Sequence, residues 1–416
     1  MNVIMGFIGI ITLVAFAILL SSNRRAINKR TVLLAFAIQA SFGIFVLYLP
    51  VGKDILLSMA NGVQWVINSS HEGISFLFGG LVSDKMAELF GDGGFIFALK
   101  VLPVIIFFSS LIAVLYYLGI MQKVIAIIGG ALQKLLRISK PEAMSATANI
   151  FVGLTEAPLV VRPFIGRMSE SQLFAVMVGG TASVAGSILV GYAALGIDLK
   201  YLIAGCFMAA PGGLLMAKLI MPEQGTPIES VESIDELDEE KPVNIIDAAA
   251  GGAAVGIKLA INVGGMLLAF LGLIALLNGI VMGIASLLGF DGVTIELLLG
   301  YMFSPIAFLI GVPWDEALQA GSFIGQKFMV NEFIAYSNFV DIKDTLTEHT
   351  QVIITFALCG FANLASIAIL VGGLGALAPN RRHDIARLGF KAVVAGTLSN
   401  LMSATLAGIF ISLAAY

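Results

Sequence analysis

Long apolar segments recur along the whole chain and are separated by short polar or charged stretches. A helix needs about 20 mostly apolar residues to cross the hydrocarbon core of a bilayer. This pattern predicts about eight transmembrane helices. The expected spans are Val3–Leu20, Thr31–Val51, Phe95–Leu118, Leu173–Leu195, Tyr201–Met221, Ile257–Ile284, Val352–Leu374 and Leu388–Ala415.

Two other segments, Asp54–Ser70 and Gln122–Ser139, combine charged residues with apolar residues at helical spacing. A helix with one apolar face and one charged face lies in the interface of a membrane rather than across it. We therefore predict that both segments are interfacial helices.

Two further segments, about 142–167 and about 314–339, are apolar overall but are interrupted by polar residues near their middles. Such backbone is tolerated at membrane depth only where it is buried in protein or lines a cavity. We predict two re-entrant helical hairpins, each entering and leaving on the same side. The interrupting residues are Asn149, Gly153, Thr155, Glu156 and Pro158 in hairpin 1, and Gly321, Gly325, Lys327, Asn331 and Glu332 in hairpin 2.

The composition agrees with a membrane protein. The chain is 58% hydrophobic and 12% charged, whereas soluble domains are about 25% charged. The segment from Glu223 to Lys241 carries a net charge of −7 in a chain whose net charge is −4, so the rest carries +3. An acidic run of this kind indicates a solvated linker, over 222–244, between two membrane halves.

Lysine and arginine are concentrated in loops, and this bias predicts orientation because such loops stay cytoplasmic. With eight spans and two same-side hairpins, every basic cluster falls on one face, together with the acidic linker. Both termini then lie on the other, periplasmic face of a bacterial inner membrane. The expected units are 1–94 (N-terminal scaffold helices), 95–221 (first repeat) and 245–416 (second repeat), joined by the linker.

The stretch 180–191 resembles the stretch 360–372, since each places small and polar residues in the middle of a span after a broken hairpin. In this topology the first span runs outward and the second inward. This is the pattern of an inverted repeat with a binding site at the repeat interface. For either span alone, ordinary helix packing through small residues is the alternative explanation.

Glu156 and Glu332 are ionisable groups at membrane depth, where charge is costly and usually functional. An ionised carboxylate accepts hydrogen bonds, which suits sugar hydroxyls or the N–H groups of a base. A buried ion pair between Glu332 and Lys327 is the alternative. Asn149 and Ser183 offer side-chain oxygens which, with the carbonyls of Val152 and Val184, form an oxygen set suited to a hard cation such as sodium.

At these residues the chain resembles the concentrative nucleoside transporter family, in its bacterial, sodium-coupled branch. The resemblance covers essentially the whole chain. Its most specific stretches are 149–153 with 155–158, Asn331-Glu332-Phe333 with Ala335-Tyr336, 359–363 with Ser366, and Gly311-Val312-Pro313-Trp314.

The resemblance implies a homotrimeric, sodium-coupled nucleoside symporter in the lipid bilayer that works by alternating access. It implies no enzyme activity, no cofactor and no nucleic-acid partner. Thr155 and Glu156 would face the base, with Ile188 nearby, and Phe361 would flank the nucleoside. Glu332, Asn363 and Ser366 would bind ribose hydroxyls. Asn149, Val152, Ser183 and Val184 would hold one sodium ion.

One residue departs from the family pattern. The family usually has glutamine before Thr155, where it bonds the base, and this chain has Leu154. Leucine neither donates nor accepts a hydrogen bond, so the sequence predicts weaker or altered base selectivity with ribose recognition intact.

Three other functions remain open. A proton-coupled symporter would be driven by an acidic gradient without sodium, and the presence of Asn149 and Ser183 favours sodium. A channel would show flux linear in concentration. An intramembrane enzyme is disfavoured because His71, His349 and His383 are scattered without metal-ligand spacing.

Overall fold

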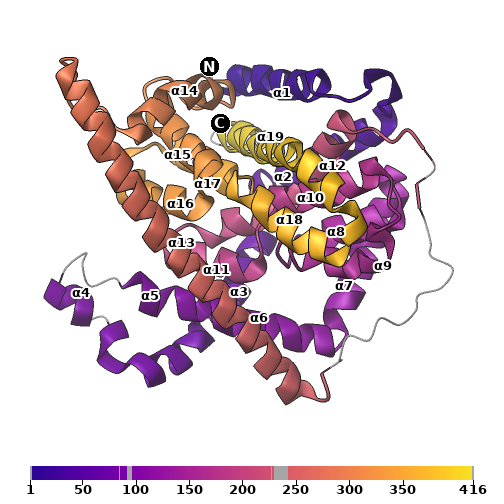
Figure 1. The fold of residues 1–416 in the computed structure, drawn as a ribbon, viewed down its shortest axis with the longest axis horizontal. Helices are drawn as coiled ribbons and strands as arrows, with labels where there is room; N and C mark the ends of the chain where they lie inside the picture. Colours follow the sequence, from indigo (N-terminus) through magenta and orange to yellow (C-terminus); the bar gives the residue numbers. More distant parts are fainter. Residues whose placement is uncertain (1, 84, 91–95, 226, 229–241, 415–416) are drawn as a thin grey trace.

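The computed structural model describes residues 2–83, 85–90, 96–225, 227–228 and 242–414, and this part of the chain is helical without any strand (Figure 1). The predicted all-α class is confirmed. Residues 229–241, which make up most of the predicted linker and contain most of its acidic side chains, lie outside the described residues.

An asparagine and a proline set the boundaries of two N-terminal helices. Asn28 caps α2 by accepting hydrogen bonds from the N–H groups of Arg30 and Thr31. Pro50 begins α3 and leaves Leu49 extended, so the expected span to Val51 ends earlier than predicted. These helices are α1 (Asn2–Leu19), α2 (Lys29–Leu47), α3 (Pro50–Phe78), α4 (Lys85–Phe90) and α5 (Phe97–Lys100).

The first repeat contains a helical hairpin and a broken helix. Ser139 and Glu142 form a capping box at the start of the hairpin, and its chain leaves the helix after Ala148. The broken helix stops at Ala182 and resumes at Gly186. The helices are α6 (Leu102–Tyr117), α7 (Ile120–Leu136), α8 (Lys140–Ala148), the 3₁₀ turn η4 (Ala157–Val161), α9 (Arg162–Ile165), α10 (Glu170–Ala182), α11 (Gly186–Ala194) and α12 (Leu199–Ile220).

The second repeat follows the same order after a long helix, α13, of 43 residues. Figure 1 shows α13 running diagonally along one side of the molecule. The sequence pattern does not predict α14, because its 15 residues are too few for a span and include Pro305. The helices are α13 (Ile245–Leu287), α14 (Ile295–Leu309), α15 (Ala317–Met329), α16 (Glu332–Ile342), α17 (Glu348–Leu358), α18 (Ala365–Leu377) and α19 (Arg382–Ala414).

Six helical segments in the described part of the chain are long and apolar enough to cross a membrane, and they coincide with six of the eight expected spans. The other two are α1, with 18 residues, and the pair α17 and α18, which a break divides. The predicted interfacial segment Asp54–Ser70 lies inside the longer helix α3.

The two repeats run in opposite senses. Glu170 at the start of α10 pairs with Arg387 near the start of α19, at 2.5 Å. Glu348 at the start of α17 instead lines a pocket with Ile411, near the end of α19. Since α10 and α17 begin at opposite ends of one long helix, the order of elements is repeated with inverted direction.

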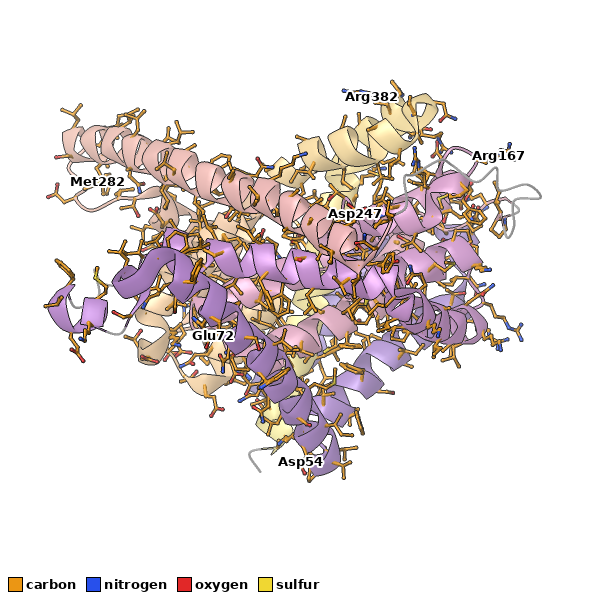
Figure 2. All side chains as sticks on the ribbon, turned by 90° about the horizontal axis from the view of Figure 1, so that it is seen from below. Asp54, Glu72, Arg167, Asp247, Met282 and Arg382 are labelled. Carbon is orange, nitrogen blue, oxygen red and sulfur yellow. The ribbon has the colours of Figure 1, made fainter. Side chains whose placement is uncertain are left out.

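Two of the basic segments, around Arg167 and around Arg381, meet at one end of the molecule. The amide of Asn380 donates to the carbonyl of Gly166, and the guanidinium of Arg381 donates to the carbonyl of Met168. Figure 2 places Arg167 and Arg382 on the same side, and Figure 1 places the two termini close together. Which side of a membrane this basic end faces stays a prediction.

Candidate functional site

One cavity lies where the hairpin tips and the helix breaks of both repeats meet. It encloses about 760 Å³ of space between atoms, part of it open to the outside. The long helix α13 closes one wall with apolar side chains, including Leu259, Val263 and Met266. Every residue predicted to bind substrate lines this cavity, namely Leu154, Thr155, Glu156, Ile188, Glu332, Phe361, Asn363 and Ser366.

Glu332 is held in place by two hydrogen bonds on its two carboxylate oxygens. Oε1 accepts from the hydroxyl of Tyr192 at 2.9 Å, and Oε2 accepts from the amide of Asn363 at 3.0 Å. The side chain is only 4% exposed. It begins α16, whose first turn is capped by Asn331 through a 2.9 Å bond from the N–H of Ile334. A carboxylate at a helix N-terminus is favoured by the helix dipole.

Asn363 and Ser366 form a polar pair at the break between α17 and α18. The Asn363 side-chain oxygen accepts from the N–H of Ser366 at 2.9 Å and lies 3.0 Å from its hydroxyl. The Ser366 hydroxyl also donates to the carbonyl of Phe361. With Glu332, this arrangement presents adjacent donors and acceptors, as recognition of a vicinal diol requires.

Glu156 lies across the cavity, at the tip of hairpin 1. Its Oε2 accepts a 2.8 Å hydrogen bond from the N–H of Gly153, which folds the tip back on itself. Thr155 beside it is exposed, whereas Leu154 and Ile188 are 6% and 2% exposed. The leucine thus places an apolar surface in the cavity at the departure noted in the sequence.

The four predicted sodium ligands lie where hairpin 1 packs on the α10–α11 break. The N–H of Gly186 donates to the carbonyl of Phe151 at 3.0 Å, which joins tip and break. The amide nitrogen of Asn149 donates to the carbonyl of Ser145 at 2.9 Å. Its oxygen Oδ1 is buried without a hydrogen-bond partner among the described residues. Val152, Ser183 and Val184 lie outside the helices, on this same contact.

Lys327 does not form an ion pair with Glu332 among the described residues. Its ammonium group donates instead to the carbonyl of Ala357 and to Oδ1 of Asn400, both at 2.7 Å. The Asn400 amide then donates to the carbonyls of Ala182 and Cys359, where α10 and α17 end. The buried ion pair with Lys327, which is the alternative explanation for Glu332, is therefore not formed in the described part of the structure.

Sequence reasoning missed Tyr192 and Asn400. Asn400 carries a usable signal, since an amide in the middle of a predicted span is costly without a partner. Tyr192 carries none, because a tyrosine in an apolar segment is ordinary and its bond joins residues 140 positions apart.

Comparison with known proteins shows which family the chain belongs to. Family models for the Na⁺ dependent nucleoside transporter match at residues 8–81 for its N-terminus and 201–408 for its C-terminus. A model described as nucleoside recognition matches residues 98–198. The chain belongs to the concentrative nucleoside transporter family. The members of this family are transporters and not enzymes.

Two bacterial relatives resemble the chain over its whole length. An uncharacterized transporter of Haemophilus influenzae is 56% identical, with 100% of this chain and 99% of the relative covered. The nucleoside permease NupC of Helicobacter pylori is 50% identical, with 98% of each covered.

Solved structures of the transporter CNTnw resemble the whole fold. Its inward-facing, substrate-bound state is 57% identical, has a TM-score of 0.96 and covers 99% of each chain. A double variant in an outward-facing state is 58% identical, has a TM-score of 0.98 and also covers 99% of each chain. CNTnw therefore exists in states open to either side.

Proposed function

We propose that this protein is a sodium-coupled nucleoside symporter that works by alternating access. The observation that carries the proposal is the cavity itself. Two carboxylates, Glu156 and Glu332, face it from the tips of opposite hairpins. Behind one tip lies the side-chain oxygen of Asn149, which has no hydrogen-bond partner in the described part of the chain. A ligand between the tips contacts both repeats at once, as a substrate site at the interface of an inverted repeat does.

The ribose and the base of the nucleoside contact residues of different repeats. Glu332, Asn363 and Ser366 bind the ribose hydroxyls, since their bonds already hold acceptors and donors side by side. Thr155 and Glu156 face the base, with Ile188 and Leu154 as apolar contacts, and Phe361 flanks the ligand.

Sodium binds between Asn149, Val152, Ser183 and Val184. A hard cation prefers oxygen ligands, and the oxygen of Asn149 is available for one. Because this site and Glu156 share the hairpin 1 tip, an ion that orders the tip favours nucleoside binding. By linkage, the nucleoside then raises sodium affinity by the same factor.

Uptake of radiolabelled uridine into proteoliposomes tests the function. An inward sodium gradient is expected to drive saturable accumulation, and sodium is expected to lower the uridine concentration for half-maximal uptake. Uptake driven by an acidic exterior without sodium would instead establish proton coupling. Uptake linear in uridine concentration would establish a channel.

The assembly and placement we propose are a homotrimer in the bacterial inner membrane with both termini periplasmic. Native mass spectrometry in detergent tests the trimer. Labelling of single cysteines at position 4 and at position 383 with a membrane-impermeant maleimide tests the orientation. Only the first is expected to react in intact cells.

A further inference from the structure

The two repeats use the same backbone contact to seat each hairpin tip on its broken helix. In the first repeat the carbonyl of Phe151 accepts from the N–H of Gly186 at 3.0 Å. In the second, the carbonyl of Phe328 accepts from the N–H of Leu364 at 3.1 Å. This match makes the neighbourhood of Lys327 the counterpart of the neighbourhood of Asn149.

Both neighbourhoods are places where two helices end. In the first repeat α8 and α10 end beside the predicted sodium ligands, and in the second α15 and α17 end beside Lys327. A helix C-terminus carries partial negative charge and up to four carbonyls without helical partners. Two converging C-termini therefore favour a cation at the same position in each repeat.

The repeats differ in where that cation comes from. The last turns of α8 and α10 contain no basic side chain, and Oδ1 of Asn149 is buried without a partner among the described residues. The last turn of α15 contains Lys327, which is 2% exposed. Its ammonium bonds the carbonyl of Ala357 in the last turn of α17.

The lysine completes the hydrogen bonding of the α17 terminus. All four of the last carbonyls of α17 have donors, whereas Oδ1 of Asn149 in the first repeat has none within the described residues. The donors are the hydroxyl of Tyr336 to Thr355, the N–H of Cys359 to Phe356, the ammonium of Lys327 to Ala357 and the N–H of Gly360 to Leu358.

We propose that the ammonium of Lys327 is a built-in cation that occupies, in the second repeat, the position that an ion takes in the first. It binds the hairpin 2 tip to the α17 break in every state of the cycle, so only the first repeat takes up an ion. The assignment of the ion in the first repeat as sodium rests on the proposed function. The role of Lys327 rests on its hydrogen bonds to the carbonyl of Ala357 and to Oδ1 of Asn400.

Two substitutions test whether Lys327 occupies a position that binds a cation or is only a structural residue. Lys327→Ser removes the charge, opens space and adds an oxygen, so a sodium ion can enter. Lys327→Met removes the charge but fills the space, so it cannot. Each purified protein is heated in sodium chloride and in choline chloride without nucleoside, and its thermal unfolding midpoint is measured.

We expect Lys327→Ser to gain about 3 °C more from sodium than Lys327→Met does, because an ion bound only to the folded state stabilises it. Sodium dependence of uptake by Lys327→Ser should also steepen, with a Hill coefficient above that of the unsubstituted protein. Equal sodium responses of the two variants would overturn the proposal. If Lys327→Ser yields no folded protein, Lys327→Gln, which keeps a carbonyl oxygen, is compared with Lys327→Met in its place.

The unsubstituted protein provides the separate test of sodium coupling. If sodium changes neither its unfolding midpoint nor its uptake, the proposed coupling ion is wrong. The comparison of Lys327→Ser with Lys327→Met still decides the role of the lysine, because it measures a response that the substitution creates. Lys327→Arg, which retains the charge, should respond to sodium as the unsubstituted protein does.

Discussion

The hydroxyl group of Tyr192 in α11 donates a hydrogen bond of 2.9 Å to one carboxylate oxygen of Glu332 at the start of α16. The bond joins the broken helix of the first repeat to the hairpin of the second. If Glu332 binds the substrate as we propose, the bound substrate is connected through this bond to the first repeat as well as the second.

Tyr192→Phe removes this donor and leaves a buried carboxylate oxygen underpaired. A hydrogen bond to a charged group contributes about 1.5–3 kcal/mol, so uridine KM should rise by roughly tenfold or more. Uptake into proteoliposomes measures the change. Tyr117→Phe, at an exposed position, is the control, and an unchanged KM for Tyr192→Phe would show that the bond does not serve substrate binding.

Leu154→Gln introduces the residue that the family resemblance leads us to expect before Thr155. The leucine lies against the cavity and is 6% exposed. A gained hydrogen bond to the base is worth about 0.5–1.5 kcal/mol, so uridine KM should fall by about two- to tenfold. Uptake of uridine, cytidine and adenosine is compared, with Leu154→Met as the apolar control. Ordinary uridine affinity that the substitution leaves unaltered would contradict the role assigned to this position.

Asn149→Ala and Ser183→Ala each remove one oxygen from the proposed sodium site. The sodium concentration for half-maximal uridine uptake should rise by about tenfold, since one ligand to a cation is lost. Maximal uptake at saturating sodium should change less. Ser187→Ala, a buried serine one turn away in α11, is the control. Equal sodium dependence in all three variants would refute the site.

Asn400→Leu removes the amide that connects Lys327 with the ends of α10 and α17. Buried groups left without partners cost about 1–3 kcal/mol each, so the loss should total several kcal/mol. Thermal unfolding in detergent should show a midpoint lowered by about 5 °C or more. Thr397→Val, on the same helix, removes a single bond to Val393 and should change the midpoint far less.

Much of the fold follows from local patterns in the sequence. The hairpin 1 tip is predicted because Glu156 and Pro158 cannot continue an apolar helix, and the break after Ala182 because serine and glycine follow in mid-span. The helix boundaries follow less closely from the sequence. Pro50 ends the expected second span early, since a proline disfavours helix at the residue before it.

The residues that line the candidate site can be predicted from the sequence, but the hydrogen bonds that hold them in place cannot. The eight residues predicted to bind substrate lie in segments whose convergence the internal repeat suggests. The bonds that hold them do not follow from any local pattern. Asn400 reaches Ala182 across 218 positions of sequence, and such a contact exists only once helices have packed. The sequence shows that Lys327 is a charge at membrane depth. Its hydrogen-bond partners cannot be predicted, because they depend on where α17 ends and on how α19 packs.

The length of α13 sets how the protein sits in its lipid environment. Its 43 residues extend about 65 Å at 1.5 Å per residue, about twice the hydrocarbon thickness of a bilayer. The helix therefore tilts in the bilayer or extends beyond its hydrocarbon core, and membranes of different thickness will favour different inclinations. Because α13 forms one wall of the cavity, we expect the turnover rate in proteoliposomes to change with the acyl-chain length of the lipid.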